Sequence, residues 1–360
     1  MAKYPPGQPS VRSVAKAAGV SAMTVSLALR NHPRIPPATR AAVQKVAAKL
    51  GYRPDPNIAK LMHLLRAGSR PGYQASIMAI TNVREGADSS YLNDIRQSAQ
   101  RRAEELGYGF SVWRLSDAPN SKAALQRVFR SRGIEGIMIL PMATPRDVTE
   151  VIGWDEFSVV SASYSILAPD FHRIVPHQFG NALELCQQLT RRGYRRLGLV
   201  LPAEQDIRVH HGFSAAVAWQ SLDGGTELVR SCIHEGTLPP AAMLRAWFAR
   251  ERPDVIIAGA DKECVAIAAQ LKLSVPGPVA FASTTRTGHS VFAGIDERPA
   301  EIGSAAIEQL AAMIQRGEKG TPATPKVTMI TGRWIDGASA KARKPRRLPL
   351  RKPPELGWTG

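Results

Sequence analysis

The sequence predicts a small all-α head, made of a helix-turn-helix and a hinge helix, followed by an α/β body of two lobes. Three observations support this fold class. Residues 10–29 read as two short helices joined by a tight turn. Residues 73–337 alternate short apolar runs with amphipathic segments, which is typical of a parallel α/β sheet. The net charge of +17 is concentrated at the two ends of the 360-residue chain.

The first predicted helix of the head begins after Ser10. Gly19 would end this helix, because only glycine adopts a left-handed turn without steric cost. Ser21 is placed to cap the second helix. The apolar positions of the first helix recur at helical spacing and are Val11, Val14, Ala15 and Ala18.

The second predicted helix has two distinct faces. Its inward stripe is formed by Val25, Ala28 and Leu29, and its opposite face carries Met23, Ser26, Leu27 and Arg30. A helix-turn-helix lays such an outward face in the major groove of DNA, so we expect contacts with base pairs. Met23 and Leu27 cannot hydrogen-bond to a base edge and therefore favour thymine methyl groups. The alternative is that both side chains pack inside the head.

A third helix is predicted over residues 37–50, and a prolyl linker then leads to a short hinge helix. The apolar face of the hinge helix is formed by Ile58, Leu61, Met62 and Leu65. A helix of roughly eight residues is mostly unfolded by itself in water, so this one needs a partner. Two copies that pair across a dimer axis, with Leu61 wedged into a kinked minor groove, would supply it.

Two sets of strands and helices are predicted in the body, and each set fits one lobe. The strands are expected at residues 76–81, 109–115, 134–141, 157–163, 197–202, 228–233, 254–260 and 278–283. The helices are expected near residues 91–106, 121–132, 145–151, 212–222, 239–250, 262–271 and 301–316.

Charge separates the two ends of the chain from the body. Residues 1–72 hold twelve lysines and arginines against one acidic residue, Asp55. Residues 338–360 hold seven against Glu355, and the remaining residues carry no net charge. This distribution indicates a polyanionic partner at the ends and a different ligand in the middle.

Several classes of protein are disfavoured by the sequence. No run of about 18 apolar residues occurs and the first residues lack the apolar core of a signal peptide, so we expect no membrane contact and a cytoplasmic location. Cys186, Cys232 and Cys264 lack metal-ligand spacing and are expected to be buried thiols without a metal. No G-x-S-x-G, Walker A or H-E-x-x-H motif occurs, so neither an enzyme nor a cofactor is expected.

The head carries a run of specific motifs. They are V-A-x-x-A-G-V-S-x-x-T-V-S from Val14 to Ser26, T-R at Thr39–Arg40, L-G-Y-x-P at Leu50–Pro54, and Leu61 in the hinge. With these motifs the head resembles that of the LacI/GalR (lactose-repressor) family of bacterial transcription regulators. The resemblance implies base contacts at Ala22, Met23 and Leu27. It implies phosphate contacts at Ser21, Thr24, Ser26, Arg34, Thr39 and Tyr52. The candidate DNA-binding set is completed by Ser10, Arg30, Ile58 and Leu61.

The order of elements in the body resembles the periplasmic-binding-protein-like body of the same family. There a small-molecule effector sits between the lobes, and lobe closure shifts the dimer and the hinge helices. The candidate effector-binding residues are Ser90, Tyr91, Arg208, Asp261 and Thr284.

Three departures from the family pattern argue against an ordinary hexose effector. Ala260 replaces an asparagine before Asp261, Ala282-Ser283-Thr284 replaces G-Y-D, and Arg208 is displaced by one position. Asp261 could equally cap a helix, and Arg208 could be a solvated loop residue.

Residues 338–360 are basic and rich in proline, and they are expected to form a disordered tail. This tail could add salt-sensitive attraction to DNA, or it could serve only for solubility. The family members that tetramerise do so through a C-terminal leucine heptad helix, which this sequence lacks. A homodimer is therefore expected rather than a tetramer.

The expected organisation has four parts. Residues 1–53 form the DNA-binding head, 54–72 the linker and hinge helix, 73–337 the effector-binding and dimerisation body, and 338–360 the tail. The expected function is a sequence-specific transcription regulator, favouring a repressor, that binds a palindromic operator in double-stranded DNA and responds to a small molecule such as a sugar. The alternatives are a solute-binding or sugar-modifying protein and a ligand-blind DNA binder. The sequence leaves open the effector, the operator, the regulated genes and the sign of regulation.

Overall fold

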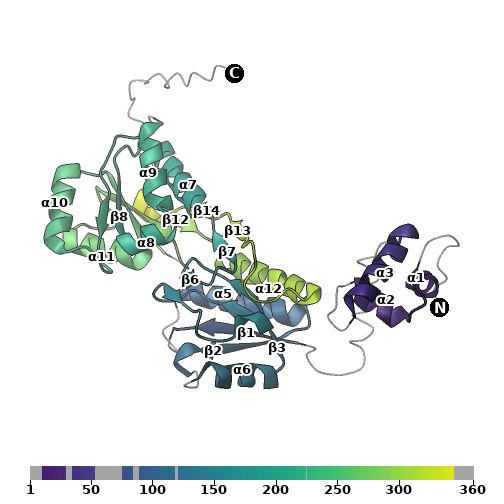
Figure 1. The fold of residues 1–360 in the computed structure, drawn as a ribbon. Coiled ribbons are helices and arrows are strands. Elements are labelled where there is room, and N and C mark those ends of the chain that lie inside the picture. The colour runs from purple at the N-terminus through teal and green to yellow at the C-terminus, as the bar shows by residue number, and fades with distance from the viewer. Residues whose placement is uncertain are drawn as a thin grey trace, which may run out of the picture. The chain divides into compact units, whose positions relative to one another are not determined.

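The computed structural model describes residues 10–29, 35–52, 75–83, 89–117, 121–223, 225–288 and 290–343, and it divides the chain into two compact units (Figure 1). The first unit is the head, within Met1–Gly72, and the second is the body, within Tyr73–Gly360. The predicted hinge helix, with Ile58 and Leu61, lies outside the described residues, as do Arg30 and Arg34.

The head consists of three helices, as the sequence predicted: α1 (Val11–Ala18), α2 (Ala22–Leu29) and α3 (Pro37–Lys49). The Ser10 hydroxyl accepts a 3.2 Å hydrogen bond from the Ser13 amide at the start of α1. Gly19 ends this helix at φ +66°, a conformation that favours glycine.

The core of the head draws on all three helices. Its buried members are Val14, Ala15, Val25, Ala28, Val43 and Ala47. The outward half of α2 is absent from this core. One face of the helix therefore builds the fold, and the other remains available for contacts.

The first lobe of the body is built on a parallel sheet of order β13-β7-β5-β3-β1-β2. Its strands are β1 (Ser76–Thr81), β2 (Gly109–Arg114), β3 (Ile134–Ile139), β5 (Ser158–Ser161), β7 (His172–Pro176) and β13 (Val327–Ile330). Its helices are α5 (Ser90–Glu105), α6 (Lys122–Ser131) and α12 (Pro299–Arg316). A short strand pair, β4 (Arg146–Asp147) and β6 (Ile166–Ala168), accompanies this sheet.

The second lobe has a sheet of order β14-β12-β11-β10-β8-β9, in which β14 is antiparallel to β12. Its strands are β8 (Leu197–Pro202), β9 (Cys232–His234), β10 (Val255–Ala260), β11 (Ala280–Thr285), β12 (Ala293–Asp296) and β14 (Arg333–Ile335). Its helices are α7 (Gln178–Arg191), α8 (Ala203–Arg208), α9 (Gly212–Leu222), α10 (Ala241–Glu251) and α11 (Asp261–Leu271).

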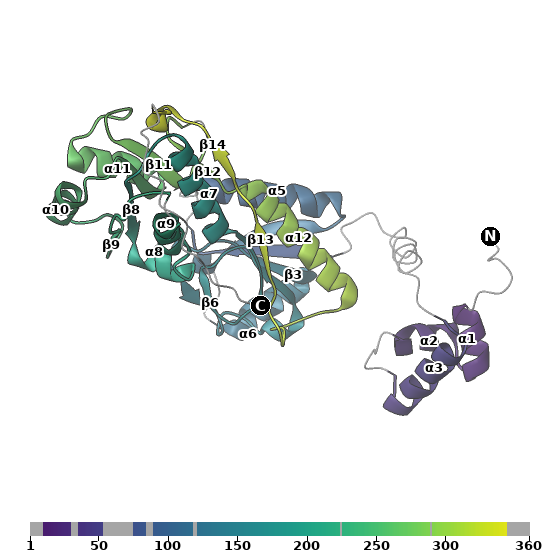
Figure 2. The ribbon, with the colours of Figure 1, turned by 90° about the horizontal axis from the view of Figure 1, so that it is seen from above.

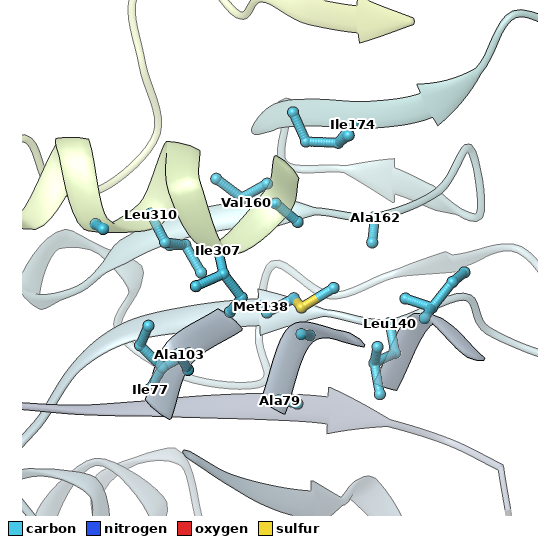
Figure 3. Close-up of a cluster of buried hydrophobic side chains, with 14 of the residues drawn as sticks. Ile77, Ala79, Ala103, Met138, Leu140, Val160, Ala162, Ile174, Ile307 and Leu310 are labelled. Atoms are coloured by element: carbon cyan, nitrogen blue, oxygen red, sulfur yellow. The ribbon is translucent and has the colours of Figure 1, made fainter. Parts of the chain in front are cut away.

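Helix α12 closes the core of the first lobe. Figure 3 shows Ile307 and Leu310 of this helix facing Met138 and Val160 of the sheet. Helix α5 lies beside α12, and the two approach closely at Gly303, where a Cβ atom would collide with the Ile95 carbonyl oxygen. Glycine is therefore required at this crossing.

Within the described body, the chain passes between the lobes three times. It passes from β7 to α7, from β12 to α12, and from β13 to β14. Figure 2 shows the last passage as the yellow stretch that runs from one sheet to the other. Each lobe is consequently assembled from segments that are distant in sequence.

Two sequence-based expectations were wrong. The helix expected near residues 145–151 is replaced by strand β4 and a turn, in which Val148 packs into the first-lobe core. The tail was expected to begin at residue 338, but Ser339 and Ala340 are buried in the second lobe.

Residues 338–343 are held in place by specific contacts. The Ser339 hydroxyl donates a 2.6 Å hydrogen bond to the Phe281 carbonyl oxygen and accepts one of 2.9 Å from the Ala293 amide. The Arg343 guanidinium stacks on the Tyr194 ring, 4.4 Å from its centroid. The body therefore extends at least to Arg343, and the rest of the predicted tail lies outside the described residues.

The close helix crossing provides a direct test of the first-lobe core. Gly303→Ala should lower the free energy of unfolding by about 1–3 kcal/mol, because the added methyl group must push α12 away from α5. Chemical denaturation would measure this loss. Glu308→Ala is a suitable control on the exposed side of the same helix and should cost less than about 1 kcal/mol. Equal effects of the two substitutions would contradict the proposed crossing.

Candidate functional sites

The outward face of α2 is the first candidate site. Met23 is 73% exposed, whereas Val25 and Ala28 of the same helix are fully buried. Leu27 is half-buried. The structure thus rules out packing inside the head for Met23, while Leu27 lies at the border between core and surface. The outward side of α2 therefore carries an exposed methionine that the core of the head does not use.

Polar groups at the start of α2 complement this apolar face. The Ser21 hydroxyl accepts a 3.0 Å hydrogen bond from the Thr24 amide and lies 2.9 Å from the Thr24 hydroxyl. A helix N-terminus with exposed hydroxyls can bind phosphate through its free amides and its dipole.

The remaining described residues of the predicted DNA-binding set have structural surroundings of their own. Thr39 lies in the first turn of α3, and Ser10 caps α1. Tyr52 packs against the head core, and its amide donates a 2.9 Å hydrogen bond to the Ala47 carbonyl oxygen. The sequence holds no acidic residue before Asp55, so the head meets a polyanion without local charge repulsion.

The second candidate site lies where strands of the body end. Ser90 and Tyr91 begin α5, and Arg208 ends α8. Asp261 begins α11, and Thr284 lies near the end of β11. Parallel strands place their carboxyl ends at one edge of a sheet, where loops and helix N-termini bind ligands.

Glu297 brings two of these predicted residues together with new ones. It follows β12 and is only 3% exposed. The Gln178 amide donates a 2.8 Å hydrogen bond to its carboxylate. Tyr91 and Thr285 also hydrogen-bond to Glu297, and Arg208 acts electrostatically on Tyr91. Tyr91 and Arg208 therefore share one polar cluster.

Burial controls the ionisation of this cluster. It raises the pKa of Glu297 to about 7, although the hydrogen bonds from Gln178, Tyr91 and Thr285 act in the opposite direction. It also raises the pKa of Tyr91 well above its usual value, and the Glu297 carboxylate adds to this effect. The pKa of Tyr164 is raised by burial, with Arg173 and Glu297 as its charged neighbours.

The other predicted effector residues lie apart from these contacts. Thr284 is buried, and its hydroxyl donates a 2.8 Å hydrogen bond to the Gly259 carbonyl oxygen, so it serves the second sheet. The carboxyl of Asp261 does not cap α11, since Glu263 accepts the hydrogen bond from the Ala260 amide. One Asp261 oxygen is buried without a hydrogen-bond partner, and this leaves it available to a ligand.

A buried carboxylate stabilises the turn that follows Arg208. Asp206 accepts hydrogen bonds from the Ser214 hydroxyl at 2.6 Å and the Ser214 amide at 3.2 Å, and it lies 3.0 Å from the His211 ring. His210 and His211 both have positive φ, which marks a strained turn between α8 and α9. The Ser214 hydroxyl also donates a 3.2 Å hydrogen bond to the His211 carbonyl oxygen and not to the His211 ring, so the group stabilises the turn and lacks the side-chain Ser–His contact of a catalytic triad.

Sequence reasoning missed Glu297 and Gln178. An acidic residue directly after an apolar strand was the available signal for Glu297, but residues 293–299 read as an ordinary loop. Gln178 carried no signal, because its role depends on the passage from β7 to α7.

Other types of site received little support in the described part of the chain. It contains no group of three or more His, Cys, Asp or Glu side chains that could hold a metal ion. None of its helices is long and apolar enough to cross a membrane. The three cysteines are buried and free, and burial raises the pKa of the Cys186 thiol to about 12.

Comparison with known proteins agrees with this geometry. Residues 10–55 match the family described as bacterial regulatory proteins, lacI family, and residues 186–340 match the periplasmic binding protein-like domain. The sucrose operon repressor of Escherichia coli is 26% identical over 262 residues, which are 70% of this chain and 76% of the repressor. The transcriptional repressor PurR of Klebsiella pneumoniae is 20% identical over 76% of this chain and 79% of its own.

Solved structures show the same fold. A transcriptional regulator CelR–cellobiose complex has a TM-score of 0.55 and 18% identity, and the match covers 92% of this chain and 99% of CelR. A lac repressor dimer bound to operator and the anti-inducer ONPF has a TM-score of 0.53 and 14% identity over 93% of this chain and 99% of its own. The chain thus combines a lacI-family DNA-binding head with a periplasmic binding protein-like domain, and the relatives named above are regulators of the LacI family.

Proposed function

We propose that this regulator is a dimeric repressor that binds a palindromic operator and is controlled by a small carbohydrate-like effector between the lobes. The observation that carries the proposal is the exposure of Met23 on a helix whose inner face is fully buried. The charge distribution supports it, with a basic head and a body of no net charge. Such a protein acts in the cytoplasm, where its DNA is found.

The head recognises DNA through two kinds of contact. The hydroxyls of Ser21 and Thr24 and the lysines and arginines of the head bind phosphates, which fixes the position of α2. Met23 then meets the major groove, where an apolar side chain favours the methyl group of thymine. Since one half-site offers few contacts of this kind, a symmetric pair of heads on an inverted repeat provides the required affinity.

The body binds the effector through hydrogen-bonding side chains. The unpartnered oxygens of Asp261 and Gln178 accept hydrogen bonds, Arg208 donates them, and Tyr91 offers an aromatic face. A hydroxyl-rich ligand satisfies such a set. The names of the sucrose operon repressor and of the CelR–cellobiose complex favour a disaccharide over a single hexose.

Two other functions make different demands on the molecule. A solute-binding protein needs no DNA-contacting helix. The exposed face of α2 therefore argues against this function. A DNA-binding protein without a ligand needs no polar cluster in its body. The grouping of Tyr91, Arg208 and Glu297 therefore argues against this function. Salt-dependent binding to an inverted repeat and a thermal response to a sugar distinguish the three functions.

Base recognition by Met23 can be tested by selecting binding sites from a randomised inverted-repeat DNA library. We expect the natural chain to select thymine opposite Met23. Met23→Arg should instead favour guanine there, with a change in preference of about 1–3 kcal/mol, because arginine pairs with the guanine edge. Ala41→Arg adds the same charge on exposed α3 and should strengthen binding to all sequences alike. An unchanged preference in Met23→Arg would refute the contact.

The effector site can be tested by the thermal midpoint of the full chain in the presence of sucrose or cellobiose. A ligand of the native state must raise the midpoint, by the equivalent of about 2.7 kcal/mol at a hundred times its Kd. Arg208→Ala should weaken this response at least about tenfold in apparent affinity. Arg245→Ala, on the exposed side of α10, should leave it unchanged. If neither sugar raises the midpoint, the disaccharide assignment fails.

A further inference from the structure

Glu297 occupies a junction between the lobes. Strand β12 belongs to the second sheet and α12 packs on the first, so residues 296–299 form one of the three passages between lobes. Gln178, its 2.8 Å hydrogen-bond partner, directly follows another passage, from β7 to α7. Tyr91 comes from the first lobe. The Glu297 carboxyl therefore joins groups from both lobes.

The hydrogen-bond partners of Glu297 carry no charge. Gln178, Tyr91 and Thr285 supply these contacts from α7, α5 and β11. Asp296 is an acidic neighbour and disfavours a second negative charge. Asp296 is itself engaged, because it accepts a 3.0 Å hydrogen bond from Arg333 of β14.

Two arginines act electrostatically on tyrosines near Glu297, and neither forms an ion pair with Glu297 among the described residues. Arg208 of α8 acts on Tyr91, and Arg173 of β7 acts on Tyr164, which in turn faces Glu297. Among the ion pairs of the described residues, Arg173 pairs with Asp170 and Arg333 with Asp296. A charged Glu297 therefore has neutral donors only, and these do not offset the cost of burying the charge.

Burial consequently favours the protonated carboxyl in the arrangement described here, and raises its pKa to about 7. Loss of the proton leaves a buried charge that water would stabilise. Separation of the groups packed around the carboxylate would admit water, and of these groups Tyr91 comes from the first lobe whereas Gln178 and Thr285 come from the second.

We propose that Glu297 is a proton-controlled latch, which holds the two lobes together when it is neutral and favours their separation when it is ionised. A regulatory role for the latch rests on the proposed function, in which the effector changes the arrangement of the lobes. The latch itself is a property of the body and requires neither effector nor DNA. It makes the regulator respond to pH near neutrality.

The distance between the lobes is the direct measurement. Nitroxide labels can be attached to Arg127→Cys on α6 and Arg245→Cys on α10, because both positions are exposed and the natural cysteines are buried. Pulsed electron paramagnetic resonance on the full chain then gives the distance distribution. We expect a longer and broader distribution at pH 8.5 than at pH 6, with the midpoint of the change near pH 7.

Substitutions in the labelled chain identify the responsible group. Glu297→Gln should give the same distribution at both pH values. Glu297→Asp should keep a pH-dependent change, which a merely structural role would not predict. Tyr91→Phe removes a donor that favours the charged form and should move the midpoint to higher pH. Glu263→Gln is the matched control, since Glu263 is a half-buried glutamate whose pKa is also raised by burial but which lies within the second lobe.

Thermal stability gives an independent readout. The folded chain keeps the Glu297 proton at a pH where the unfolded chain has lost it, so this group contributes stability below about pH 4.5 that is lost as the pH rises through about 7. The thermal midpoint of Glu297→Gln should therefore fall less over this range than that of the natural chain.

Two outcomes would overturn the latch. One is an identical distance distribution of the natural chain at pH 6 and 8.5. The other is an undiminished pH response in Glu297→Gln. Neither outcome would affect the test of operator or sugar binding, so failure of the latch and failure of the proposed function can be told apart.

Discussion

The burial of α12 against the first sheet is the interaction on which the rest of the body depends. This helix supplies Ile302, Ile307 and Leu310 to the first-lobe core, yet the strand that precedes it belongs to the second sheet. Neither lobe can therefore complete its core until the chain has passed through both. The same passage carries Glu297 to the junction, where Tyr91 of α5 and Gln178 of α7 hydrogen-bond to its carboxyl group. The packing of one helix thus sets both the stability of the lobe and the place of the polar cluster.

Local sequence patterns predicted many of the helices and strands, but they did not predict the connections between distant parts of the chain. The spacing of Val14, Val25 and Ala28 identified the head helices and separated the buried face of α2 from exposed Met23. The strands β1, β2, β3, β5, β8, β10 and β11 were also found, because their apolar runs end at clear turn signals, whereas β7, β12, β13 and β14 were not predicted. The three passages between lobes have no local signature, since a strand reads the same whichever sheet it joins. Glu297 and Gln178 were missed for this reason, whereas Tyr91 and Arg208 were named through the family resemblance and remain predicted effector contacts.

The head and the body divide the work by charge and by the type of contact. The head has a small apolar core and no acidic residue, so it meets a polyanion with exposed methionine and hydroxyl groups. The body has no net charge, and its functional groups are buried or half-buried at the ends of strands. Thr284 illustrates the limit of reasoning from position. It occupies a position that binds ligand in the family, but its hydroxyl donates a hydrogen bond to the Gly259 carbonyl oxygen. Effector recognition would then depend on other side chains.

The hydroxyl of Ser339 has a practical consequence for anyone who shortens this protein. It pairs at once with the Phe281 carbonyl oxygen and the Ala293 amide, which belong to two neighbouring strands of the second sheet. A chain cut before this serine would leave both backbone groups without a protein partner, at a cost of about 1–3 kcal/mol for each group that stays buried. A domain boundary drawn before Ser339 from composition alone would therefore remove a residue that joins two strands of the second sheet.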